Sequence, residues 1–206
     1  MKYQICVSGA ASGKTIEASH QLAYDLGVAI AKSGKTLLTG ATVGLPWFAA
    51  KGAFSVANRA GVSVGFSPAS SFREHVTVYK LPTVEFDYLN FTGMAYVGRN
   101  VHLVRSSDAL ITVGGRIGSL HEFVTAIESH KVIGVLLGSG GLADYIPTLI
   151  QNVESKGLDT KDIIYDTDPT RLVSKVVKEL DIRYGDFKHD GTDNAIHSKN
   201  RDEDFG

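Results

Sequence analysis

The sequence contains very little cysteine: Cys6 is the only one in 206 residues. A single cysteine excludes a disulfide within the chain and also excludes a zinc site built from several cysteines. Cys6 lies in the apolar stretch YQICVSG, an environment typical of a buried and unreactive thiol. Cys6 is therefore expected to contribute to packing.

The chain also lacks a strong net charge, a run of basic residues and a long apolar segment. Lys and Arg number 21 against 22 Asp and Glu, so the formal net charge is −1. No overall basic field favours nucleic acid or an anionic membrane. No stretch of 18 apolar residues is present, and the first residues resemble a strand more than a signal peptide. We predict a cytoplasmic protein that binds neither nucleic acid nor membrane.

Apolar strand patterns alternate with helical patterns over most of the chain. Strands without polar alternation are typical of strands buried on both faces, and intervening helices imply right-handed parallel crossovers. These patterns predict an α/β fold: a Rossmann-like, doubly wound, mainly parallel open sheet with helices on both faces. Residues 1–184 are expected to form one domain, and the polar, aperiodic residues 185–206 a C-terminal tail. The expected strands are 3–9, 35–40, 62–68, 108–115, 131–138 and 162–168, with short strands near 76–81 and 83–87.

The stretch VSGAASGKT, residues 7–15, suggests a P-loop, but its spacing is short by one residue. A P-loop places four residues between its first glycine and Gly-Lys-Thr. Only three follow Gly9, and Ser8 stands where that glycine is needed. We therefore interpret Ser8 and Gly9 as part of the turn that leaves the first strand at a ligand crevice. Thr15 is expected to cap the first helix.

The segment GGRIGSLHE, residues 114–122, runs from a predicted strand into a predicted helix. Its three glycines permit close backbone approach, and free amides at a helix N-terminus favour a phosphate. Ser119 and Glu122 have the spacing of a capping box. Glu122 has a second interpretation, in which its carboxylate faces a ribose and stabilises an oxocarbenium ion. The seven histidines show no ligand spacing, so no metal site is predicted.

Three segments occur in an order that resembles the LOG family, once labelled lysine decarboxylase-like, which includes the molybdenum-cofactor carrier proteins. They are TGATVGLPWFAAKGAFSVANRAGVSVGFSP, then GRN, then DALITVGGRIGSLHEF. Residues 114–122 fit the Gly-Gly-x-x-Gly-Thr-x-x-Glu form of the family motif, with Ser119 in place of Thr. The resemblance extends over roughly residues 1–150.

The resemblance implies a Rossmann-like fold, a homodimer or higher homo-oligomer, and a nucleotide-type small-molecule ligand. Active LOG enzymes hydrolyse the N-glycosidic bond of cytokinin or purine nucleoside 5'-monophosphates, and they require no cofactor. The family's catalytic arginine and glutamate map to Arg99 and Glu122. The residues expected to line the phosphate and nucleotide site are Ser8, Gly9, Gly40, Gly44, Gly114, Gly115, Gly118 and Ser119.

The sequence departs from the active enzymes at three positions. Active enzymes carry Met-x-x-Arg-Lys, whereas Met94 stands five residues before Arg99 and Asn100 replaces the lysine. Val113 replaces the proline before the double glycine. These departures resemble the carrier-like branch, so a binding or carrier protein for a phosphorylated nucleotide- or pterin-type cofactor, such as the molybdenum cofactor, is the alternative function. Arg99 has an alternative structural interpretation as an exposed charge or a partner of Asp108.

Overall fold

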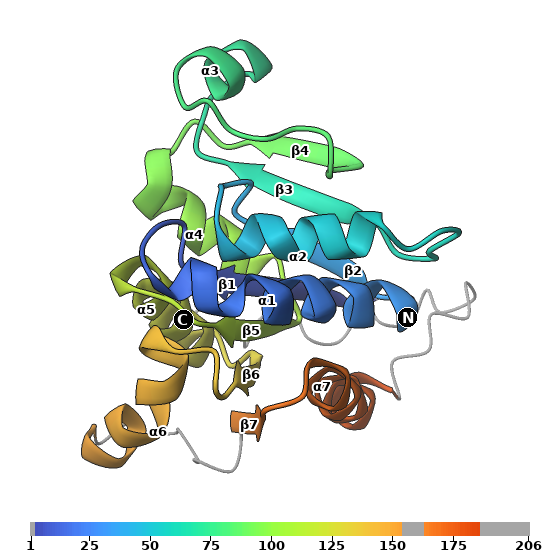
Figure 1. The fold of residues 1–206 in the computed structure, drawn as a ribbon, viewed down its shortest axis with the longest axis vertical. Helices are drawn as coiled ribbons and strands as arrows, with labels where there is room; N and C mark the ends of the chain where they lie inside the picture. Colours follow the sequence, from blue (N-terminus) through green and yellow to red (C-terminus); the bar gives the residue numbers. More distant parts are fainter. Residues whose placement is uncertain (1–2, 154–162, 186–206) are drawn as a thin grey trace, which may run out of the picture.

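The computed structural model describes residues 3–153 and 163–185, and seven parallel strands form one sheet at its centre (Figure 1). The strand order is β4-β3-β2-β1-β5-β6-β7, with every neighbouring pair parallel. The predicted Rossmann-like class is confirmed. The strands are β1 (Gln4–Gly9), β2 (Thr36–Thr39), β3 (Ser63–Ser67), β4 (Tyr88–Phe91), β5 (Ala109–Val113), β6 (Val132–Leu136) and β7 (Ile163–Asp166).

Helices cover both faces of the sheet and enclose two hydrophobic clusters. Alternate residues of β1 point to opposite faces, so Ile5 packs in one cluster and Cys6 in the other, both fully buried. One face is covered by α1 (Thr15–Lys32), α2 (Leu45–Phe54) and α7 (Pro169–Tyr184). The other face is covered by α4 (Ala95–Arg105), α5 (Ile117–Glu128) and α6 (Gly141–Asn152).

The strand order places a crevice between β1 and β5. From β1 the chain proceeds outward through β2, β3 and β4 along one half of the sheet, and from β5 through β6 and β7 along the other. The two strands pair up to Gly9 and Val113, so the loops that follow them diverge from one point. Ligands of doubly wound proteins bind at this switch point.

Several predicted boundaries are wrong for local reasons. Residues 76–81 do not form a strand. Val76 and Thr77 instead end α3 (Phe72–Thr77), a helix that begins where the Ser71 side chain accepts the backbone N–H of Glu74 at 3.2 Å, and residues 78–81 form a turn and loop. The edge strand starts only at Tyr88, beyond the predicted 83–87 stretch. Thr15 is the first residue of α1, whose N-cap is Lys14. Almost all of the predicted tail, 185–206, lies outside the described residues.

Candidate functional site

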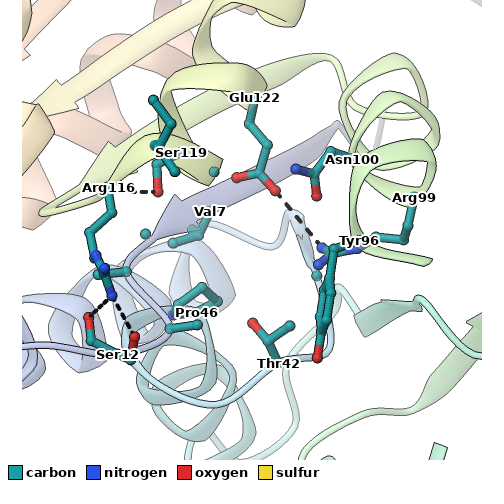
Figure 2. A pocket seen from close by; sticks show the side chains of 16 residues that line it. Val7, Ser12, Thr42, Pro46, Tyr96, Arg99, Asn100, Arg116, Ser119 and Glu122 are labelled. Atoms are coloured by element: carbon teal, nitrogen blue, oxygen red, sulfur yellow. Dashed lines mark hydrogen bonds and ion pairs between the residues drawn. The ribbon is translucent and has the colours of Figure 1, made fainter. Parts of the chain in front are cut away.

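A cavity of about 340 Å³ opens at the switch point, at the carboxyl ends of β1, β2 and β5 (Figure 2). Loops from distant parts of the sequence meet there, and α4 and α5 form its walls. Its volume lies at the lower end of the range for small-molecule sites. Six of the ten predicted site residues line it: Gly9, Gly40, Arg99, Gly118, Ser119 and Glu122.

A buried ion pair between Arg99 and Glu122 lies on one side of the pocket. Arg99 Nη1 is 3.8 Å from Glu122 Oε1, and the residues are 4 % and 7 % exposed. Arg99 belongs to α4 and Glu122 to α5, so the contact depends on how these helices pack. The alternative interpretation of Arg99 as an exposed charge or an Asp108 partner is wrong, because Asp108 instead accepts the backbone N–H of Gln4.

Burial dominates the electrostatics of this pair. Desolvation raises the pKa of the Glu122 carboxyl above its ordinary value, although Arg99 and a hydrogen bond from Ser8 oppose the rise. Desolvation likewise lowers the pKa of Arg99, and Glu122 opposes that change. A carboxylate with a raised pKa is suited to accept a proton near neutral pH.

The Arg99 guanidinium rests against Gly40, in the loop that follows β2. A Cβ at residue 40 would stand 1.7 Å from Arg99 Nη1, so only glycine leaves room for the guanidinium. Among the described residues, Arg99 Nε has no hydrogen-bond partner. Arg99 is thus a buried cation with unused donor capacity beside the pocket.

The N-terminus of α5 forms the opposite side of the pocket, away from the ion pair in Figure 2. Ile117, Gly118 and Ser119 line the pocket with the first helical turn, whose N–H groups have no intrahelical partners. The capping-box spacing predicts Ser119 as the N-cap of α5. That prediction is wrong, because the helix begins at Ile117 and Arg116 is the N-cap. Glu122 therefore caps nothing, and its carboxylate is available to the pocket.

Arg116 adds a cation to this anion-favouring helix end. Its Nη1 donates to Ser12 Oγ at 2.6 Å and thereby joins the β5–α5 loop to the β1–α1 loop on this side of the pocket (Figure 2). Lys14, from the segment that resembles a P-loop, caps α1 and does not line the pocket.

Four predicted residues lie outside the pocket lining. Ser8 lies beneath it and donates a hydrogen bond to Glu122 Oε2. Gly44, Gly114 and Gly115 have φ values of 81°, 56° and 106°, which favour glycine, and they shape the loops around the pocket. The carbonyls of Gly114 and Gly115 accept N–H groups of α6, at 2.8 Å and 3.1 Å.

The sequence prediction did not assign five polar residues that line the pocket: Ser12, Thr42, Tyr96, Asn100 and Arg116. In the amide orientation that gives both of its polar atoms a partner, Asn100 Nδ2 donates to Glu122 Oε1 at 3.0 Å. The Tyr96 ring is 6.0 Å from the Arg99 guanidinium carbon. Tyr96 and Asn100 lie on α4 close to Arg99 in sequence, which was the available signal for these two, whereas Thr42 lies in the loop between β2 and α2.

Residues 3–153 and 163–185 present neither a metal-binding cluster nor a membrane-spanning helix. They contain no group of three or more His, Cys, Asp or Glu side chains arranged to hold a metal ion. They also contain no helix with the length and apolar character needed to cross a membrane.

The parallel sheet and the pocket at its switch point define a Rossmann-like α/β protein. The SLOG cluster4 family profile matches residues 2–173, and the chain belongs to that family. The LOG-type resemblance deduced from the glycine motif is thereby confirmed.

Individual relatives match this chain in sequence or in fold. An uncharacterized protein of Archaeoglobus fulgidus is 35% identical over 133 residues, covering 65% of this chain and 79% of its own. The structure of TM1055 has a TM-score of 0.70 at 21% identity and covers 87% of this chain and 99% of its own. The molybdenum cofactor carrier protein of Chlamydomonas reinhardtii has a TM-score of 0.67 at 25% identity, with coverage of 87% and 98%.

Proposed function

We propose that this protein binds a nucleoside 5'-monophosphate in the switch-point pocket and hydrolyses its N-glycosidic bond. The observation that carries the proposal is the division of the pocket into two sides. Arg116 and the free amides at the start of α5 lie on one side, and the buried Glu122–Arg99 pair lies on the other (Figure 2). A nucleotide likewise separates its phosphate from C1' by the length of a ribose.

The phosphate end requires no metal or cofactor in this proposal. Amides of the first turn of α5 and the positive helix end favour an anion, and no acidic residue occupies that turn. Arg116 supplies a guanidinium that can bind a phosphate with two parallel hydrogen bonds. Because Gly118 has no side chain, the anion can approach the backbone closely.

The chemical end supplies a base and a cation. Glu122 accepts a proton from water, the water oxygen bonds to C1', and the bond between C1' and the base breaks. The products are the free base and ribose 5-phosphate, and the base leaves with a proton from the solvent. Carboxylate stabilisation of an oxocarbenium-like transition state serves glycoside cleavage in the same way. Arg99 opposes the rise in the pKa of Glu122 that burial causes, and it offers an unused N–H donor to the ligand.

One assay tests this function: incubation with AMP and with isopentenyladenosine monophosphate, followed by chromatography for free base and ribose 5-phosphate. We expect release by wild type, loss of release by Glu122→Gln, and unchanged release by Glu128→Gln. Glu128 is a matched control because it is exposed on the same helix. Binding of the nucleotide without release of free base would refute the proposed hydrolase activity.

A second candidate function is the binding and carriage of a molybdenum cofactor without turnover. It is supported by the structural similarity to the Chlamydomonas reinhardtii carrier protein and by Asn100 and Val113, which replace residues of the active LOG motif. Arg116 and the α5 N-terminus fit the terminal phosphate of the pterin. Binding of the cofactor by wild type, together with no release from AMP, would favour this function.

We also infer that the chain forms a homodimer through α4. Val97 and Val101 are 71% and 37% exposed, and their spacing of four residues places them on one stripe of the helix. Met94, the N-cap residue before the helix, is 47% exposed. Contiguous apolar side chains on a surface are typical of an interface. The stripe lies on the helix that carries Arg99 and Tyr96, so pairing there would place a second chain beside the pocket.

A further inference from the structure

Ser8 occupies an unusual position for a residue predicted to contact a ligand. It is the last residue but one of β1 and is 1 % exposed, and it does not line the cavity that its neighbours Val7 and Gly9 line. Its hydroxyl donates a hydrogen bond to Glu122 Oε2, across 114 residues of sequence. The hydroxyl is therefore committed to the carboxylate.

The two oxygens of Glu122 have different neighbours. Ser8 contacts Oε2 from the strand beneath the pocket. Oε1 faces α4, where it accepts from Asn100 Nδ2 at 3.0 Å and lies 3.8 Å from Arg99 Nη1. Contacts on both oxygens restrict rotation of the carboxylate about its terminal bond, a torsion that is otherwise broad.

We propose that Ser8 is a positioning residue, whose hydroxyl holds Glu122 Oε2 against β1 and so directs Oε1 toward Arg99 and the ligand. The positioning role rests on the proposed function, because it serves the chemistry of Glu122. It differs from the role predicted from sequence, in which Ser8 touches the ligand.

The same hydrogen bond contributes to the pKa of Glu122. The titratable groups that face this carboxyl are Arg99 from α4, His121 from α5 and Cys6 from β1. Ser8 and Arg99 each lower the pKa of Glu122 against the rise caused by burial. Removing the hydroxyl takes away a donor that favours the ionised form, so the pKa of Glu122 rises further.

The direct test is a pH titration of Glu122 in the full chain, monitored by NMR of protein labelled with ¹³C at the glutamate carboxyls. The Glu122 signal is assigned by its disappearance in Glu122→Gln. We expect Ser8→Ala to move the Glu122 midpoint upward by about one to two pH units, the size of one hydrogen bond to a charged group. Ser8→Cys, which keeps the side-chain size with a weaker donor, should give a smaller upward shift.

The matched control is Thr112→Val. Thr112 pairs with Ser8 in the sheet and is equally buried, but its hydroxyl has no hydrogen-bond partner among the described residues. Its removal should leave the Glu122 midpoint unchanged. An unchanged midpoint in both Ser8 variants, or an equal shift in Thr112→Val, would overturn the proposal.

Kinetics with AMP supply a second readout. A positioning role predicts that Ser8→Ala lowers kcat by about tenfold or more and changes KM less than about twofold, because Ser8 makes no ligand contact. A raised KM with unchanged kcat and an unchanged Glu122 midpoint would instead make Ser8 a ligand contact. If wild type hydrolyses no AMP, the proposed function fails, yet the titration still decides whether Ser8 controls Glu122.

Discussion

Replacing Gly118 by alanine should separate the stability of α5 from the function of its N-terminus. Gly118 is the second residue of α5 and its φ is not positive, so its backbone conformation suits any residue. A Cβ built at this position meets nothing within 4 Å. The glycine at position 118 is therefore not required by backbone strain or by crowding within the chain. A ligand in the pocket that Gly118 lines would explain why this position has no side chain.

The two expected effects of Gly118→Ala have opposite signs. The free energy of unfolding should rise by about 0.5 to 1 kcal/mol, because alanine loses less backbone entropy than glycine on folding. In a chain of 206 residues, this corresponds to a Tm increase of about 1 to 4 °C. The added methyl would hold a phosphate away from the first-turn amides, and losing one charge-assisted hydrogen bond weakens AMP binding by about tenfold to hundredfold.

Two measurements test these effects. Circular dichroism monitors thermal unfolding and gives the change in stability, and calorimetry measures the affinity for AMP. Gly52→Ala is the matched control, because its Cβ would stand 2.0 Å from the carbonyl oxygen of Tyr24, where α1 and α2 cross away from the pocket. That variant should lose stability and, while folded, retain AMP affinity. If Gly118→Ala binds AMP as tightly as wild type, the anion does not sit on the N-terminus of α5.

Three further perturbations test other parts of the site and the surface. Gly40→Ala should displace the Arg99 guanidinium and lower AMP hydrolysis at least tenfold while cooperative unfolding persists; full activity would show that the Gly40 contact is not needed. Arg99→Met removes a charge that lowers the pKa of Glu122. The free energy of unfolding of this variant should therefore fall below that of wild type by about 3 kcal/mol at pH 8, and by less toward pH 4, where Glu122 is protonated. A difference that does not change with pH in denaturant titrations would contradict this. Val97→Lys should reduce the mass measured by light scattering to the 22.1 kDa of one chain, whereas Val62→Lys, another exposed apolar site, should not; an unchanged mass for Val97→Lys would place the interface elsewhere.

The sign of the Arg99→Met prediction follows from proton linkage. Burial already places the folded-state pKa of Glu122 above that of the unfolded chain, so the folded state binds the proton more tightly. Stability then falls as pH rises from the unfolded pKa, near 4.5, through the folded pKa, and stays constant above it. Without Arg99 the folded pKa lies higher, so this loss extends over a wider range of pH.

Much of the fold was predictable because it depends on local patterns. The run ALITV is buried at every position and forms β5, as its unbroken apolar character predicts. Asp168 before Pro169 predicts the start of α7, where the Asp168 side chain accepts the backbone N–H of Arg171 at 2.8 Å. Residues 76–81 show the limit of such patterns, since their β-branched character was outweighed by the helix that Ser71 caps.

The candidate site was predictable as a set of loops but not as a set of contacts. Glycines after successive strands indicate a crevice, because carboxyl ends of parallel strands meet at one edge of the sheet. The bond from Ser8 to Glu122 and the contact of Arg99 with Gly40 join residues far apart in the chain. Such contacts depend on strand order and helix packing, which no local pattern records.

The sequence by itself determined the alternation of strands and helices, the position of the glycine motif and the family resemblance, since each is a property of residue order and spacing. Only the tertiary structure decided that Glu122 caps no helix and instead lies buried between Ser8 and Arg99. It also placed this pair across the pocket from Arg116 and the α5 N-terminus. The physical reason is burial: the pKa of a carboxyl depends on the solvent and charges around it, and packing supplies both.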